Sequence, residues 1–192
     1  MPAADIRGRD RANCAAASYS CQLMTELPQP GLSLAGFALA HAAWSLSDTQ
    51  DDELLCPLAV IESREGERRL LRFEAPSQEE AIVAGKTAVR EATPDAGAWA
   101  FAREAAWRRM DSEDRSHVLA IDFWARGMPG AATIMQHFNR ATNGGRFRIG
   151  GLPALVVNGM QLSASIAAPS ITAIMAGVQS HAAVAELWPK WR

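Results

Sequence analysis

The chain has 192 residues, of which 48% are hydrophobic and 21% are charged, and its formal net charge is -2. This length suits one well-buried core and is short for two full domains, so we expect a single domain. A net charge this close to zero creates no general attraction for nucleic acid or anionic lipid, and we expect neither as a partner. The 3 cysteines include no C-x-x-C pair, which argues against a zinc site, a redox pair and a disulfide-built secreted scaffold.

The first 26 residues are rich in small and polar side chains. We expect residues 1–26 to form a poorly ordered extension and residues 27–192 to form the single domain. No continuous apolar stretch follows the arginines of this extension, so a signal peptide is not predicted and we expect a cytoplasmic protein. Met24 is an alternative natural start, which the intact mass of the natively expressed protein would distinguish.

A helix is expected at about residues 32–46, in a stretch without Asp, Glu, Lys or Arg. At 1.5 Å per residue this helix is only about 22 Å long, whereas the hydrocarbon layer of a membrane is about 30 Å thick. It is also built largely from alanine and contains His41. We therefore expect a buried helix whose small residues allow close packing, not a membrane span.

The next segments predict a hairpin followed by a helix. Residues 53–62 and 69–73 are rich in β-forming side chains and are joined by a Gly-containing turn, as in a β-hairpin. Ser77 and Glu80 then have the spacing of a capping box, and an apolar stripe at helical spacing follows them. This pattern predicts a helix that ends at Thr93-Pro94-Asp95.

Residues 97–110 fit two secondary structures. Bulky side chains recur there with a period of two, which favours a strand, whereas the Ala, Glu and Arg content favours a helix. We favour the strand, because residues 111–115 resemble a turn and residues 117–125 have a clear β pattern. Together the two runs predict a second hairpin.

Further strands are expected at 132–139, 147–149, 154–157 and 160–162, and a C-terminal helix is expected to begin at Pro169-Ser170. The predicted order is α-ββ-α-ββββ-α. Strand runs joined by tight turns predict an α+β fold with a mainly antiparallel, open sheet of about five to seven strands. We expect the helices to pack on one face of this sheet.

One group of side chains on the predicted sheet suggests a site. Asp122 and Trp124 should point away from the apolar side of their strand, and Met135 and His137 should do the same on the next. If the strands are neighbours, all four lie on one surface, bordered by Arg103 or Glu104. In an enzyme acting on a small molecule, Asp122 would orient His137, which would act as a general base. An arginine salt bridge would satisfy Asp122 without catalysis.

The same surface also suits an interface, because Trp124 and Met135 would bury area against a partner. Trp188 and Trp191, in the C-terminal tail, either fold back over the domain or dock a partner. Since other catalytic signatures are missing, we expect a small binding or accessory protein that acts through protein contacts or self-association. The Asp122/His137 enzyme remains the alternative, and a small-molecule ligand remains possible within either hypothesis.

No cofactor or metal ion is predicted, because no cofactor fingerprint is present and the four histidines have no metal-ligand spacing. A weaker hypothesis is RNA binding through Phe147 together with three arginines, Arg140, Arg146 and Arg148.

Overall fold

A computed structural model describes residues 27–49, 53–108, 115–141 and 146–192. The expected extension at 1–26, with the alternative start at Met24, lies outside the described residues. Seven strands are present in the described ranges, namely β1 (Leu58–Ser63), β2 (Arg68–Arg72), β3 (Ala96–Arg108), β4 (Arg115–Ala125), β5 (Ala132–Asn139), β6 (Arg148–Val157) and β7 (Met160–Gln161). The helices there are α2 (Gln29–Ser47), α3 (Gln78–Ala92), α4 (Ala164–Gln179), α5 (Ala182–Ala185) and α6 (Trp188–Trp191).

All of these strands belong to one open sheet in the order β2-β1-β3-β4-β5-β6-β7, and every neighbouring pair is antiparallel. The α+β class and the antiparallel sheet are therefore confirmed. The described part of the ambiguous run at 97–110 is a strand, β3, whose residues 98–108 pair with β4, and residues 109 and 110 lie outside the described residues. The two short strands expected at 147–149 and 154–157 are one strand, β6, with a register shift where it pairs with β5.

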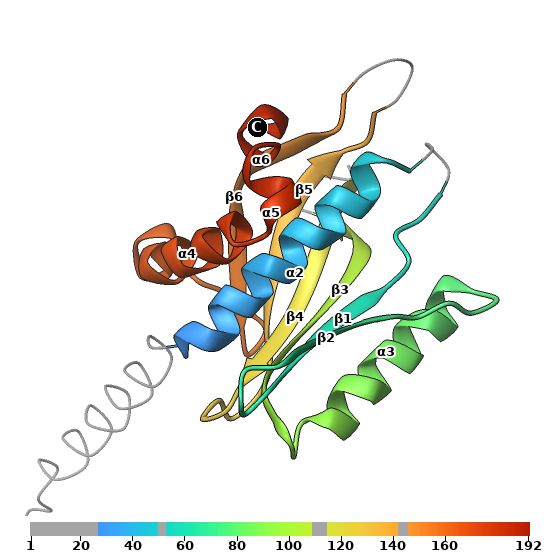
Figure 1. The fold of residues 1–192 in the computed structure, drawn as a ribbon. Coiled ribbons are helices and arrows are strands. Elements are labelled where there is room, and N and C mark those ends of the chain that lie inside the picture. Colours follow the sequence, from blue (N-terminus) through green and yellow to red (C-terminus); the bar gives the residue numbers. More distant parts are fainter. Residues whose placement is uncertain (1–26, 50–52, 109–114, 142–145) are drawn as a thin grey trace, which may run out of the picture.

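The helix α2 lies across one face of the sheet, and α4 packs beside it (Figure 1). It has no charged side chain, and 11 of its 19 residues are buried. Two glycines bring α2 and α4 together, because a Cβ atom on Gly36 would overlap the carbonyl oxygen of Ile174 and one on Gly177 would overlap that of Ser33. This close packing is the arrangement that the small residues of α2 predict. No helix among the described residues is long and apolar enough to cross a membrane.

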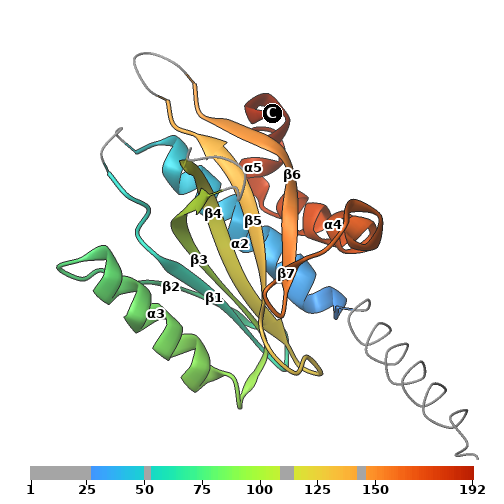
Figure 2. The same ribbon diagram turned by 180° about the vertical axis from the view of Figure 1, so that it is seen from behind.

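The expectation that all helices pack on one face is wrong. Leu58, Val60 and Ala100 point toward α2, whereas Ala59, Ile61 and Phe101 point to the opposite face, where they form a second core with α3. Figure 2 shows α3 beside β1 and β2, with β5 and β6 carrying no helix on this side. In β1 and β3, successive apolar residues point to opposite faces of the sheet. Both faces are therefore apolar there, and each requires a covering layer.

The capping box that predicts α3 is present. Ser77 accepts a hydrogen bond from the Glu80 backbone N–H, and the Glu80 carboxylate accepts one from the Ser77 N–H, both at 3.2 Å. The start of the C-terminal helix was placed wrongly, since α4 begins at Ala164 and includes Pro169. Pro169 is the sixth residue of α4, beyond its first turn, so it removes the backbone N–H that would donate to the Ser165 carbonyl, and α4 continues past it without this one hydrogen bond.

We predict that Gly36→Ala destabilises the protein. The added methyl group must push α4 away from α2, and overpacking of this kind costs about 2 kcal/mol even though alanine favours helix. Gly130→Ala is the matched control, because a Cβ atom there would meet nothing within 4 Å. Urea unfolding should show a lower free energy of unfolding for Gly36→Ala and an unchanged one for Gly130→Ala. Equal stability of the two variants would contradict the close packing.

Candidate functional site

The predicted surface residues lie on the face of the sheet opposite α2. Cross-strand pairing puts Trp99 opposite Trp124 and Phe101 opposite Asp122, and the next strand puts Thr133 opposite Asp122. Met135 and His137 follow Thr133 at alternate positions and share this face. Arg103 points the same way as Asp122, whereas Glu104 points toward the α2 side. We call this face the open face, because α3 covers only part of it.

The register of β4 and β5 separates Asp122 from His137, the pair suggested for general-base catalysis. Asp122 lies opposite Thr133, and His137 lies opposite Val118, four residues further along β5. At about 3.4 Å per residue, this places the two residues about 14 Å apart along the strands, which is far beyond hydrogen-bond reach. The shared face is present, but the structure does not bring Asp122 and His137 together.

Both carboxylate oxygens of Asp122 have structural partners. Arg103 Nη1 lies 3.0 Å from Oδ2, and the Thr133 hydroxyl donates a hydrogen bond of 2.8 Å to Oδ1. His137 instead contacts the Ser116 hydroxyl through Nδ1 at 3.1 Å. The presence of an aspartate in the middle of β4 is therefore explained by an ion pair with the neighbouring strand, as the sequence analysis allowed.

The open face contains two separate hollows. One, of about 370 Å³, lies where α3 meets the sheet and includes Asp122 and Trp124. The other, of about 330 Å³, includes Met135 and His137 and is closed at its sides by Trp107, Ala154 and Gln161. The four residues predicted to share one surface are thus divided between two hollows.

The C-terminal tail folds back over the domain. Trp188 and Trp191 are 2% and 8% exposed and belong to the main core. The Trp191 ring meets the Phe147 ring edge to face, with centroids 5.2 Å apart, and Phe147 also stacks on Phe138. These tryptophans are therefore not available as an interface, and Phe147 does not offer a ring for a nucleic-acid base.

Arg140 from the suggested RNA-binding group is also engaged in the core. Its Nη2 lies 2.6 Å from Oε2 of the buried Glu104, and its Nη1 donates to Thr49. Oε2 of Glu104 also accepts from the Leu55 backbone N–H. This network holds Thr49 and Leu55 against β3, so Glu104 and Arg140 have a structural role that the strand pattern alone did not reveal.

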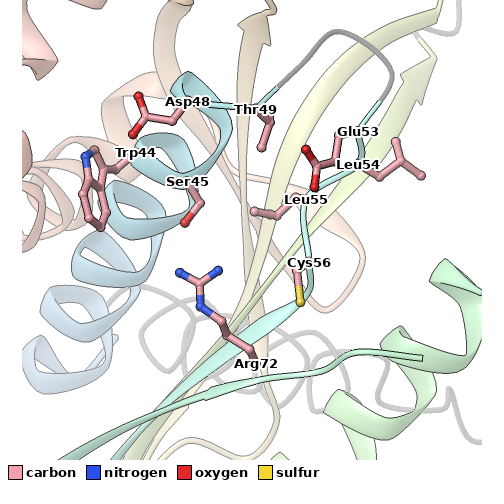
Figure 3. Close-up of a pocket in the computed structure, with 9 residues that line it drawn as sticks. All are labelled: Trp44, Ser45, Asp48, Thr49, Glu53, Leu54, Leu55, Cys56 and Arg72. Carbon is pink, nitrogen blue, oxygen red and sulfur yellow. The ribbon is translucent and has the colours of Figure 1, made fainter. Parts of the chain in front are cut away.

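A further pocket, of about 280 Å³, lies between the end of α2 and the segment before β1. Figure 3 shows the Arg72 guanidinium group pointing into it toward Ser45, with Asp48 and Glu53 on the opposite walls. The Ser45 hydroxyl is buried without a partner among the described residues. Cys56 is half-buried here, and its thiol donates to the Phe73 carbonyl at 3.5 Å.

Behind this pocket, a chain of three side chains joins β2, α2 and the start of α5. Arg72 Nη2 lies 3.3 Å from His41 Nε2, and His41 Nδ1 lies 3.0 Å from His181 Nε2. Arginine can only donate, so Nε2 of His41 accepts and its Nδ1 carries the proton that is donated to His181. Both histidines are therefore neutral while this chain is intact.

The electrostatic environment agrees with these neutral forms. Burial, followed by the neighbouring His181 and the Arg72 guanidinium, lowers the pKa of His41 to about 4. Burial also lowers the pKa of His181. The described residues contain no group of three or more His, Cys, Asp or Glu side chains that could hold a metal ion.

Another candidate surface lies on the last strands of the sheet and α4. From Ile149 to Ala185 the sequence contains no Asp, Glu, Lys or Arg. Within this segment, Leu152, Met160 and Ile166 are 62%, 57% and 44% exposed. A groove of about 450 Å³ lies between β6, β7 and the first turns of α4. We call the outer side of β6 from Ile149 onward, of β7 and of α4 the charge-free surface. The sequence analysis missed it, although the gap in charged residues was visible.

No family model, curated protein or solved structure matches this chain.

We predict that His41→Gln reduces the loss of stability in acid. A histidine whose pKa is lower in the folded state than in the unfolded state binds fewer protons when folded. The stabilising effect of neutral His41 is complete above about pH 6.5, which is the pKa of histidine in the unfolded chain. It is lost as the pH falls toward the folded-state pKa of about 4. Thermal unfolding between these two pH values should show a smaller decline for the variant than for the wild type. Parallel curves would contradict the assignment of neutral His41.

Proposed function

We propose that this protein is a small binding or accessory protein that self-associates through its charge-free surface. The observation that carries the proposal is the absence of charge from Ile149 to Ala185 together with three exposed large apolar side chains, Leu152, Met160 and Ile166. Exposed apolar patches with few charges are typical of protein interfaces, whose centres are depleted in charged residues.

The lack of charge favours a second copy of the chain as the partner. In a symmetric dimer, each residue of the patch faces the same patch on the other copy, so a charged patch would bring like charges together. An uncharged patch avoids this repulsion. A partner of different sequence would permit complementary charges, and the charge-free surface has none to complement.

The shape of α4 also supports close contact with another copy. Its outward side exposes small residues, including Ala164, Ala168, Thr172 and Ala176. Small side chains allow another helix or sheet to approach closely over a wide area. A stable dimer buries about 800 Å² on each partner. Three large side chains alone do not supply this area, so the interface that we propose includes the outward side of α4.

The proposed contact uses side chains and not added β-strand pairing. The short strand β7 pairs only with Val156 and Val157, which leaves the rest of the outer edge of β6 without a strand partner among the described residues. However, Pro153 has no backbone N–H, and Gly151 has a φ of 64°. Both features disrupt the regular edge that another strand would need.

We also propose that the protein works in the reducing environment of the cytoplasm, with its thiols free. This follows from the small number of cysteines and the absence of C-x-x-C spacing. The catalytic alternative receives less support, because the register separates Asp122 from His137 and the carboxylate of Asp122 is engaged by Arg103 and Thr133.

We predict that Leu152→Glu disrupts the dimer. A charge placed opposite its own copy in an apolar contact should weaken association by about 2 kcal/mol, which is roughly a 30-fold increase in the dissociation constant. Val83→Glu is the matched control, because Val83 is 58% exposed on α3, away from the charge-free surface. Sedimentation equilibrium should give a dimer for the wild type and Val83→Glu, and a monomer for Leu152→Glu at the same concentration.

Thermal unfolding of both variants checks that the monomeric form is folded. A wild type that remains monomeric at high micromolar concentration, or equal dimerisation of all three proteins, would refute the proposed self-association.

A further inference from the structure

The hollow between α3 and the open face has the features of a small-molecule site. Its volume is about 370 Å³. This is within the range of about 300–1,000 Å³ that is usual for ligand pockets. One wall is formed by the rings of Trp99, Phe101 and Trp124 on β3 and β4, and the other by the C-terminal half of α3. The site is separate from the charge-free surface and does not depend on self-association.

The aromatic wall is held in place by hydrogen bonds. The Trp99 indole N–H donates to the Thr93 hydroxyl at 2.9 Å, and this hydroxyl donates to the Val89 carbonyl at 2.8 Å. The Trp124 indole N–H donates to the Met128 carbonyl at 3.0 Å. Because both indole donors are occupied by the protein, the rings offer their apolar faces to a ligand in a fixed orientation. Such preorganisation reduces the entropic cost of binding.

A glycine sets how closely α3 approaches this wall. A Cβ atom on Gly85 would overlap the ring of Phe101. The contact therefore fixes the helix against the sheet at one end of the hollow, while Ala131 leaves space at another. The hollow is consequently a defined space between two packed elements and not a gap left by a loose helix.

Positive side chains outnumber negative ones around the hollow. Asp122 is the acid at its base, but the Arg103 guanidinium compensates this charge at 3.0 Å. Two further cations, Lys86 and Arg90, line the hollow from α3. They are one helical turn apart, and neither has an acidic residue three or four positions away. Neither forms an ion pair with another described residue.

Like charges at this spacing destabilise a helix by a few tenths of a kcal/mol. Lys86 and Arg90 therefore stand together at an aromatic hollow without a structural ion pair in the described chain. A bound anion would neutralise both of them, and the aromatic wall would hold the apolar part of the same molecule.

We propose that this hollow binds a small aromatic carboxylate, with the ring system between the wall of Trp99 and Trp124 and the helix α3, and the carboxylate group at Lys86 and Arg90. The ligand is expected to be aromatic because the wall of the hollow consists of fixed aromatic rings, and aromatic rings pack on one another face to edge or with offset stacking. The negative charge follows from the two cations, because charge-assisted hydrogen bonds to carboxylates are stronger than neutral ones.

The test uses 2-naphthoate and its neutral counterpart naphthalene-2-carboxamide, which have the same ring system. Isothermal titration calorimetry should give a dissociation constant about tenfold lower for the carboxylate. The double variant Lys86→Gln/Arg90→Gln should lose this preference and bind both compounds like the amide. Both side chains are exposed, so the variant should fold.

Arg148→Gln/Lys190→Gln is the matched control, because it removes the same net charge from two exposed positions on β6 and α6. It should retain the affinity of the wild type within about twofold, as long-range effects between exposed charges are largely screened. Amide chemical shifts should change at α3, Trp99 and Trp124 when 2-naphthoate is added to the wild type.

Three results would overturn the proposal. The first is no binding of 2-naphthoate at about 2 mM, where even a weak ligand is detected. The second is equal affinity of the wild type for the carboxylate and the amide. The third is equal weakening in the two double variants, or shift changes confined to residues away from the hollow.

Discussion

The burial of α2 is the constraint on which the rest of the structure depends. This helix contains no charged side chain, so it has no side that can face water over its whole length. The sheet covers one side through Leu58, Val60 and Ala100, and α4 covers another. Close packing at Gly36 and Gly177 then fixes the distance between the two helices. The C-terminal tail completes this layer with Trp188 and Trp191, which explains why its tryptophans are buried.

The burial of α2 does not explain the outer side of α4. Ile174 and Val178 face the core and must be apolar, but Ile166 and the small residues on the opposite side face solvent, where charged residues are common. The absence of charge continues across β6 and β7, including Leu152 and Met160. A requirement of folding therefore accounts for one side of α4, and the proposed contact with a second copy accounts for the other.

The two faces of the sheet separate the two proposed activities. On the α2 side, the layer of helices ends at the charge-free surface, and on the other side α3 forms the aromatic hollow with β3 and β4. The long β3–β4 ladder contributes to both layers, because alternate residues such as Ala100 and Phe101 point in opposite directions. Self-association and ligand binding can therefore be tested independently.

Local patterns in the sequence predicted local structure well. The capping box at Ser77 and Glu80 located α3, and the period of two at Trp99 and Phe101 identified β3. The same alternation placed Asp122 and His137 on one face. It could not give their separation, because the register depends on how β4 and β5 pair, and here Asp122 lies opposite Thr133. Likewise, no short-range pattern showed that α3 would cover the opposite face from α2, or that Glu104 would be buried with Arg140.

The most direct test of the central claim is an isotope-filtered NOE measurement on a mixture of ¹³C-methyl-labelled and unlabelled protein. It detects only contacts between two copies of the chain. Our account predicts intermolecular NOEs to the methyl groups of Leu152, Met160 and Ile166 and none to Val83, which is similarly exposed on α3. Intermolecular NOEs confined to Val83 and other α3 methyl groups, or no intermolecular NOEs at high concentration, would contradict it.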